Sequence, residues 1–260
     1  MMIKRFFILF MLSISLLKAD VQKTESISQE DFKKLESFFD YLIHHSSIGY
    51  SLCGEKPVSI EIFPTLSEIP IPYSVNIFLY HQGYSIEWNG LNTWKLYAHL
   101  FSSKKFAFRF IEGCNKIVFV NKCAAKEVIE ENLDLFHKYL DRTKSADEFL
   151  EELCNPKKND YMLNPHTTIL GILLGYGRNN AIAFSNKSCI QKLEPLDLAE
   201  QNICLRPFLL PGCLIINNGT NEKENAHILQ TLKSARKCLQ KKITKGHCFE
   251  TFLKLFTADD

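Results

Sequence analysis

KFAFRFIEGCNKIVFVNKCAAKEVIEENLDLFHKYL, residues 105–140, is the stretch that decides the fold. Two apolar segments, 105–111 and 116–120, flank the tetrapeptide EGCN, and this arrangement is typical of a β-hairpin. Asn121 follows the second segment and is a good N-cap for a helix that runs to Leu140. Apolar residues recur at helical spacing along one face of that helix, at Ala125, Val128, Ile129, Leu133 and Phe136. The sequence therefore predicts an antiparallel hairpin joined directly to a long helix.

Helices are also predicted on both sides of this stretch, over residues 28–45, 91–101, 145–154, 224–243 and 247–256. Ser28 can cap the first of them, with Asp31 reaching back to it. The fourth has an apolar face made of Ile228, Leu232, Ala235 and Leu239. Residues 49–63 are predicted to form two short strands around a turn at 54–57, and residues 207–216 to add a strand. The predicted fold class is α+β, mostly helical with a small antiparallel hairpin sheet.

A glycine-rich segment, GILLGYGRNN at residues 171–180, follows a strongly apolar run. We predict a buried helix from 167 towards Gly177, in which Gly171 and Gly175 lie one turn apart and allow a neighbour to approach closely. Gly177 is predicted to stop this helix at positive φ. Arg178 then either points back at the carbonyl groups of the helix end, where a cation is favoured, or lines a cleft.

The chain begins with a pattern typical of a secretory signal peptide. Lys4 and Arg5 precede an apolar run that ends near Leu17, and Ala19 provides a small residue for cleavage. We therefore predict a signal peptide over 1–19, with an uncleaved N-terminal anchor as the alternative. The rest divides into an α+β region at 20–154, a connecting loop at 155–165 and a mainly helical region at 166–260 that packs on it in one compact unit.

Composition excludes several classes of protein. Apolar residues make up 46% of the 260 residues and charged residues 23%, which is ordinary for a globular protein and excludes a disordered, collagen-like or multi-span membrane chain. Lys and Arg total 31 against 29 Asp and Glu, so no global charge points to nucleic acid. The nine cysteines contain no C-x-x-C pair. Most of them have apolar neighbours and are predicted to be buried thiols, with a disulfide framework as the alternative.

Few residues indicate chemistry, because the chain has no G-x-S-x-G, Walker or H-E-x-x-H motif. Cys53 precedes a glycine in the predicted turn and is a candidate nucleophile if a base or cation lies nearby, although a buried turn cysteine is the alternative. Arg178, Asn179 and Asn180 are candidate donors to a carboxylate or phosphate. The histidine and cysteine spacings match no common zinc site, so neither a metal nor a cofactor is expected.

A basic run near the C-terminus offers a possible partner surface, with no acidic residue among its neighbours. On a helix it would face an anionic membrane or an acidic partner, or simply solvent. Nucleic acid is not expected as a partner, and the oligomeric state is left open. The run consists of Lys233, Arg236, Lys237, Lys241, Lys242 and Lys245.

Two of these segments resemble uncharacterised exported proteins of chlamydia-related bacteria. They are GYSLCGEKPVS at 49–59 and GILLGYGRNNA at 171–181, and the hairpin and helix at 105–140 fit the same resemblance. The resemblance covers about half of the chain. It implies a bacterial protein located in the envelope or outside the cell, and it implies no activity.

The sequence favours an exported protein that acts by binding a partner or small ligand, in the periplasm or outside the cell. The alternative is a hydrolase or transferase of an unrecognised type that uses Cys53 or a cleft lined by Arg178. A nucleophile within hydrogen-bond reach of an oriented histidine would favour the enzyme.

Overall fold

The computed structural model describes residues 26–63, 85–111, 116–155, 162–163, 166–186, 193–195, 211–243 and 246–258. The predicted signal peptide, the hairpin turn at 112–115 and most of the predicted connecting loop at 155–165 lie outside these residues. Export and the predicted domain boundary therefore remain predictions.

Helices dominate the described residues, around two small antiparallel sheets. The first part of the chain forms α2 (Gln29–His45), α3 (Ile48–Cys53), β1 (Val58–Ile62), α5 (Ser85–Tyr97), the 3-10 helix η2 (Ala98–Leu100), β2 (Phe106–Ile111) and β3 (Lys116–Asn121). The second part forms α6 (Lys122–Glu131), α7 (Leu133–Tyr139), α8 (Ala146–Cys154), α9 (Thr167–Leu173), α10 (Arg178–Ser185), β4 (Leu193–Pro195), β5 (Leu214–Ile216), α11 (Glu222–Lys242) and α12 (Cys248–Thr257). The predicted α+β class, mostly helical with a small hairpin sheet, is confirmed.

The predicted hairpin forms the centre of the larger sheet, whose strand order is β1-β3-β2 with antiparallel pairing. Phe119 of β3 lies opposite Phe108 on one side and Ser59 on the other. All four apolar residues of β3 from 117 to 120 are buried. Such a continuous apolar run is what a strand needs when helices cover both faces of its sheet.

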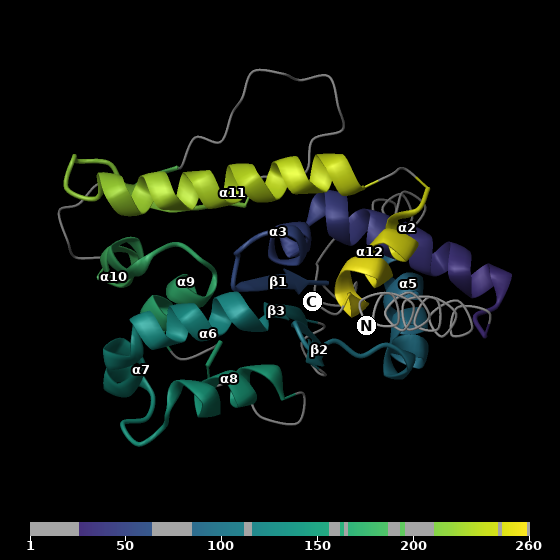
Figure 1. The fold of residues 1–260 in the computed structure, drawn as a ribbon, viewed down its shortest axis with the longest axis horizontal. Helices are drawn as coiled ribbons and strands as arrows, with labels where there is room; N and C mark the ends of the chain where they lie inside the picture. The colour runs from purple at the N-terminus through teal and green to yellow at the C-terminus, as the bar shows by residue number, and fades with distance from the viewer. Residues whose placement is uncertain are drawn as a thin grey trace, which may run out of the picture.

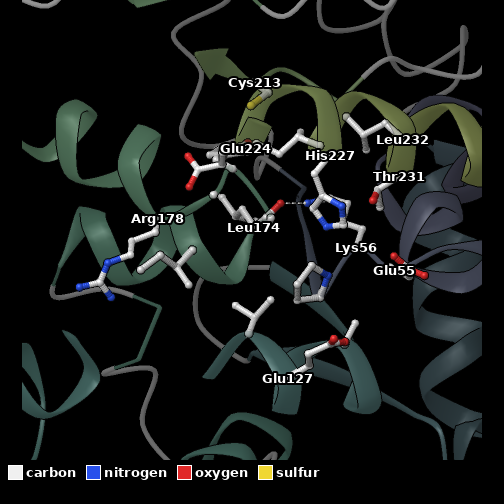
Figure 2. Close-up of a pocket in the computed structure, with 18 of the residues that line it drawn as sticks. Glu55, Lys56, Glu127, Leu174, Arg178, Cys213, Glu224, His227, Thr231 and Leu232 are labelled. Carbon is white, nitrogen blue, oxygen red and sulfur yellow. Dashed lines mark hydrogen bonds between the residues drawn. The ribbon is translucent and has the colours of Figure 1, made fainter. Parts of the chain in front are cut away.

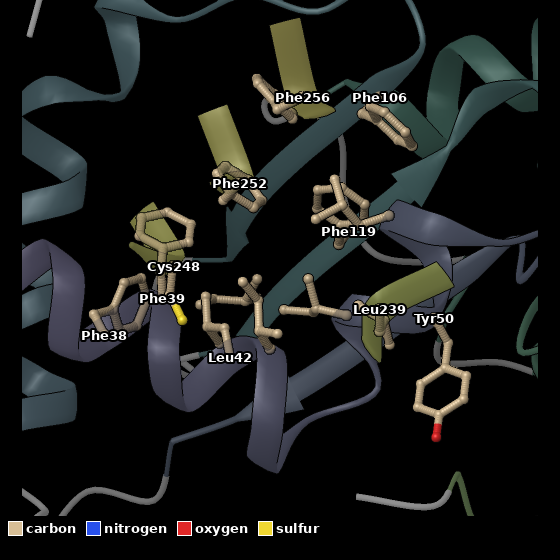
Figure 3. Packing of buried hydrophobic residues seen from close by; sticks show 14 of the residues in the cluster. Phe38, Phe39, Leu42, Tyr50, Phe106, Phe119, Leu239, Cys248, Phe252 and Phe256 are labelled. Carbon is tan, nitrogen blue, oxygen red and sulfur yellow. The ribbon is translucent and has the colours of Figure 1, made fainter. Parts of the chain in front are cut away.

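Each face of this sheet belongs to a different hydrophobic cluster. Ile117 and Phe119 pack into the cluster formed with α2, α5, α11 and α12, whereas Val118 and Val120 pack into the cluster formed with α6 to α10. Figure 1 shows α2, α5 and α12 at one end of the molecule, α6 to α10 at the other, and α11 running along both. Figure 3 shows the first cluster, in which the ring centroids of Phe39 and Phe252 lie 4.2 Å apart and the ring planes are tilted by 34°.

The predicted strand at the start of 49–63 is wrong, because residues 48–53 form α3 and only β1 is a strand. Ser46 starts this helical turn by accepting a hydrogen bond from the backbone N–H of Ile48 at 3.1 Å. The small residues of the segment then let α11 lie directly on it. A Cβ atom at Gly54 would stand 2.5 Å from Cβ of Ala235. Tertiary packing against α11 thus outweighs the local preference for a strand.

The predicted long helix to Leu140 is interrupted at Asn132. Asn121 caps α6 as predicted, since its side chain accepts a hydrogen bond from the N–H of Ala124. Asn132 leaves helical geometry at φ −120° and ψ 20°, and its side-chain amide donates to the carbonyl of Val128 at 2.9 Å. Asparagine side chains compete in this way with the backbone bonds of a helix, so α7 begins in a new direction.

The glycine-rich segment forms a helical hairpin, not one helix running to Gly177. Gly171 allows close packing as predicted, because a Cβ there would lie 2.9 Å from Cβ of Ala181 on α10. Gly175 lies beyond the end of α9 at φ +78°, so its predicted helical position is wrong. Gly177 has the predicted positive φ, +81°, but it is the N-cap of α10. Glycine is favoured at both positions because a side chain is strained there.

The two helices predicted near the C-terminus are present as α11 and α12. The predicted apolar face of α11 is buried, and α12 packs on α2. Only 214–216 of the predicted strand at 207–216 is a strand, paired with β4, and residues 207–210 lie outside the described residues.

Among the described residues, no helix is both long enough and apolar enough to cross a membrane.

Candidate functional site

A cavity of about 350 Å³ lies between α6, α11 and the turn that joins α9 to α10 (Figure 2). Its volume falls in the range of roughly 300–1,000 Å³ that is usual for small-molecule sites. The apolar part of its wall includes Val128, Ile172, Leu174, Ile228 and Leu232. The polar part includes Glu55, Lys56, Glu127, Glu131, Arg178, Glu224, His227 and Thr231.

Lys56 is the unusual group in this wall. It sits between α3 and β1 and is only 4% exposed. Its Nζ donates a hydrogen bond to the carbonyl oxygen of Leu174 at 2.5 Å and lies 5.7 Å from the ring centre of Tyr176. No carboxylate forms an ion pair with Lys56 within the described residues.

Burial lowers the pKa of Lys56 from 10.5 to about 7, because the charged ammonium loses its hydration, and this outweighs the opposing effect of Cys213. About half of the Lys56 side chains are therefore neutral amines at neutral pH. A neutral amine can take a proton as a base or add to a carbonyl carbon as a nucleophile, which an ammonium group cannot do. A strongly shifted pKa in a cavity is a physical sign of a functional group.

Cys213 lies near Lys56 in the same wall and is 5% exposed. Burial raises the pKa of its thiol to about 11, against the opposing effect of Lys56. The thiol therefore stays protonated at neutral pH and lacks the thiolate that a cysteine nucleophile requires.

The backbone donors at the start of α10 are occupied by the protein itself. The Glu224 carboxylate accepts hydrogen bonds from the N–H groups of Asn179 and Asn180, each at 3.2 Å. It also accepts one from the side-chain amide of Asn221 at 2.9 Å. A carboxylate is the natural ligand of a helix N-terminus, so this internal one takes the place of an external anion.

The side chain of Asn180 is 1% exposed and holds three elements together. Its amide nitrogen donates to the carbonyl of Tyr176 and to Oδ1 of Asn225, both at 3.0 Å. Its oxygen accepts from the backbone N–H of Ile216 at 2.8 Å and from Asn221 at 3.1 Å. Asn179 is exposed and donates to Oδ1 of Asn221 at 2.8 Å.

Arg178 lines the cavity, but its guanidinium turns away from Lys56 (Figure 2). It binds both carboxylate oxygens of Asp134, at 2.8 and 2.7 Å, and this hydrogen bonding lowers the pKa of Asp134. A third bond reaches Oδ1 of Asn132 at 3.3 Å. The predicted interaction with the end of α9 is therefore wrong: Arg178 opens the next helix and links it to α7. Both partners are exposed enough that the pair contributes little to stability.

Cys53, the other candidate, ends α3 and lies beside Cys238 of α11. Burial and the neighbouring Cys238 thiol raise the pKa of Cys53 to about 12, so it has no thiolate character at neutral pH. His44, a histidine nine residues before Cys53 in the sequence, lies against Asp40. Six cysteines of the described residues are free thiols, at positions 53, 123, 154, 213, 238 and 248.

The basic run lies on α11 as far as Lys242, and Lys245 falls outside the described residues. Lys237, Lys241 and Lys242 are exposed, which fits either a solvated surface or contact with an anionic partner. Membrane contact through this run remains a prediction.

Comparison with models of known families, with curated proteins and with solved structures gave no match at any of the three levels.

Proposed function

We propose that the protein binds a small, uncharged aldehyde or ketone in the cavity, and that the Lys56 amine is its main polar contact. The observation that carries this proposal is a buried lysine in the wall of a cavity, with no ion pair to any residue that the structure describes. A lysine placed there only for packing would be replaced at lower cost by an apolar residue. The burial of Lys56 in the cavity wall therefore favours a functional role for its amine.

A carbonyl compound suits a neutral amine because the two react reversibly. The Lys56 nitrogen adds to the carbonyl carbon, and a proton moves from nitrogen to oxygen to give a carbinolamine. Loss of water then breaks the C–O bond and leaves an imine, with no oxidant or reductant required. The cavity has a volume of about 350 Å³, whereas one water molecule occupies about 30 Å³ in the liquid. The cavity is therefore large enough for a small organic molecule.

The charges around the cavity favour a ligand without negative charge. Glu55, Glu127 and Glu131 all belong to the wall, whereas the cation Arg178 is held by Asp134. Carboxylates outnumber the lysine and arginine side chains in this wall, and an excess of one sign of charge disfavours ligands of that sign. The apolar residues of the wall would enclose the carbon part of the ligand.

Reductive labelling with propanal tests both the amine and its access to solvent. At pH 7 about half of Lys56 is neutral, against roughly 0.04% of an ordinary lysine with a pKa near 10.4. With propanal and cyanoborohydride at pH 7, we expect Lys56 to be propylated at least about tenfold faster than Lys237, as followed by peptide mass spectrometry. The Lys56 rate should level off above about pH 8, while that of Lys237 rises to pH 10.

Two variants serve as controls for this labelling. Lys56→Met should remove the fast phase, and Lys237→Met, on the exposed side of α11, should leave it unchanged. Labelling of Lys56 that is slower than that of Lys237 at pH 7 would contradict the proposal.

A further inference from the structure

A second cluster of reactive side chains lies away from the cavity, where the start of α12 meets α2. Asp40 and His44 are one turn apart on α2. Cys248, which is labelled in Figure 3, is the first residue of α12. Oδ1 of Asp40 lies 3.3 Å from Nδ1 of His44 and 3.5 Å from Sγ of Cys248. All three atoms lie within 4.8 Å of one another.

The two separations from Asp40 match those between the ligands of a tetrahedral zinc ion. Zinc bonds are about 2.3 Å long to sulfur and about 2.0–2.1 Å to nitrogen and oxygen. At a tetrahedral angle these lengths place nitrogen and oxygen about 3.3 Å apart, and sulfur and oxygen about 3.5 Å apart. One ion can therefore reach Asp40 together with either partner without a shift of the backbone.

We infer that Asp40, His44 and Cys248 form a zinc-binding site with three protein ligands. A thiolate and an imidazole favour Zn²⁺ over Mg²⁺ and Ca²⁺, which prefer oxygen ligands. Three protein ligands leave the fourth zinc position for water. No spacing motif in the sequence indicates this site, because 208 residues separate Asp40 from Cys248.

The surroundings hold Cys248 in place without the metal. The Glu36 carboxylate accepts hydrogen bonds from the N–H groups of Cys248 and Phe249 at 2.6 and 2.9 Å, which ties α12 to α2. Cys248 is fully buried, whereas the side chain of Asp40 is 30% exposed and offers the ion a route from solvent. These bonds fix the backbone of Cys248 beside α2.

A network of hydrogen bonds without a metal is the alternative. In the metal-free arrangement the Cys248 thiol donates to Asp40, and Nδ1 of His44 lies 3.0 Å from the backbone carbonyl of Asp40. Zinc would replace the thiol proton of Cys248 and the proton with which Nδ1 of His44 donates to the Asp40 carbonyl oxygen, and the imidazole would then carry its proton on Nε2. Binding therefore releases the thiol proton and weakens as the pH falls.

Cobalt substitution distinguishes the two cases in the full reduced chain. We expect one equivalent of Co²⁺ to produce thiolate-to-cobalt charge-transfer absorption in the near ultraviolet and tetrahedral d–d bands in the visible, and Zn²⁺ to displace it. Cys248→Ser should abolish the charge-transfer absorption, and His44→Gln should weaken Zn²⁺ binding at least about 100-fold in a chelator competition.

The matched control is His247→Gln, which removes an exposed histidine next to Cys248 that pairs with Glu250. This variant should bind Zn²⁺ as the wild type does. Circular dichroism shows whether each variant is folded. A wild-type chain without the charge-transfer absorption overturns the inference whatever the variants do, and so does an absorption that persists in folded Cys248→Ser.

Discussion

Lys56→Met should raise the free energy of unfolding at pH 7 by about 3 kcal/mol. The pKa of Lys56 is about 7 in the folded protein and 10.5 in the unfolded chain, so the unfolded chain binds the lysine proton more tightly. At pH 7 this difference lowers the free energy of unfolding of the wild type by an amount on the order of 5 kcal/mol. Methionine has a similar unbranched shape and no proton to lose. It leaves the carbonyl of Leu174 without its hydrogen bond, which offsets roughly 1–2 kcal/mol of the gain.

The pH dependence of this difference follows from the two pKa values. Between pH 7 and 10.5 the unfolded lysine holds a proton that the folded one has lost, so wild-type stability rises with pH in this window. Below about pH 7 both states are protonated and the dependence disappears. Lys56→Met lacks this term, so its advantage should shrink as the pH rises from 7 to 10 in urea denaturation under reducing conditions.

Lys237→Met controls for the loss of an exposed lysine and should change the unfolding free energy by less than about 0.5 kcal/mol. A Lys56→Met protein that is less stable than the wild type at pH 7 would show that the buried group is a well-solvated or paired ammonium.

Asn180→Ala should lower the free energy of unfolding by about 3 kcal/mol. The substitution removes four hydrogen bonds from a side chain that is 1% exposed and leaves the N–H of Ile216 and the carbonyl of Tyr176 without that partner. Each buried polar group left unpaired costs roughly 1–3 kcal/mol. Urea denaturation measures the change.

Asn179→Ala is the matched control, because Asn179 is the exposed neighbour with one side-chain bond to the same network. It should cost less than about 1 kcal/mol. Equal losses for the two variants would mean that Asn180 does not hold α10, β5 and α11 together.

The local pattern of apolar residues was enough to predict the helices and strands that bury one face against the core. The hairpin follows from two apolar segments on either side of a turn, and α11 follows from apolar residues at a period of 3.6. Ser28 and Ser145 cap their helices, as their positions predict. A strand was predicted at 49–53, where the structure has a helix, because α11, which is distant in the sequence, packs on this segment and determines its conformation. The break at Asn132 depends on side-chain bonds that periodicity does not reveal.

The candidate sites were harder to predict for the same reason. Lys56 stands in a Gly-Glu-Lys-Pro turn, where lysine is ordinarily exposed, and its burial comes from the turn after α9, 118 residues away. Arg178 was predicted as a donor to a ligand, but its guanidinium forms an ion pair with Asp134. The pairing of Asp40 and His44 could be read from their spacing of four on a helix. Cys248 joins them only because α12 folds back onto α2.

The central claim is that the Lys56 amine loses its proton near neutral pH, and an NMR titration tests it most directly. The protein is labelled with ¹³C at the lysine Cε carbons, and Lys56→Met assigns the resonance that disappears. We predict that this resonance titrates with a pKa of about 7 while the exposed lysines titrate near 10.5. A Lys56 resonance that titrates with the other lysines near 10.5 would contradict the claim and, with it, the proposed use of the cavity.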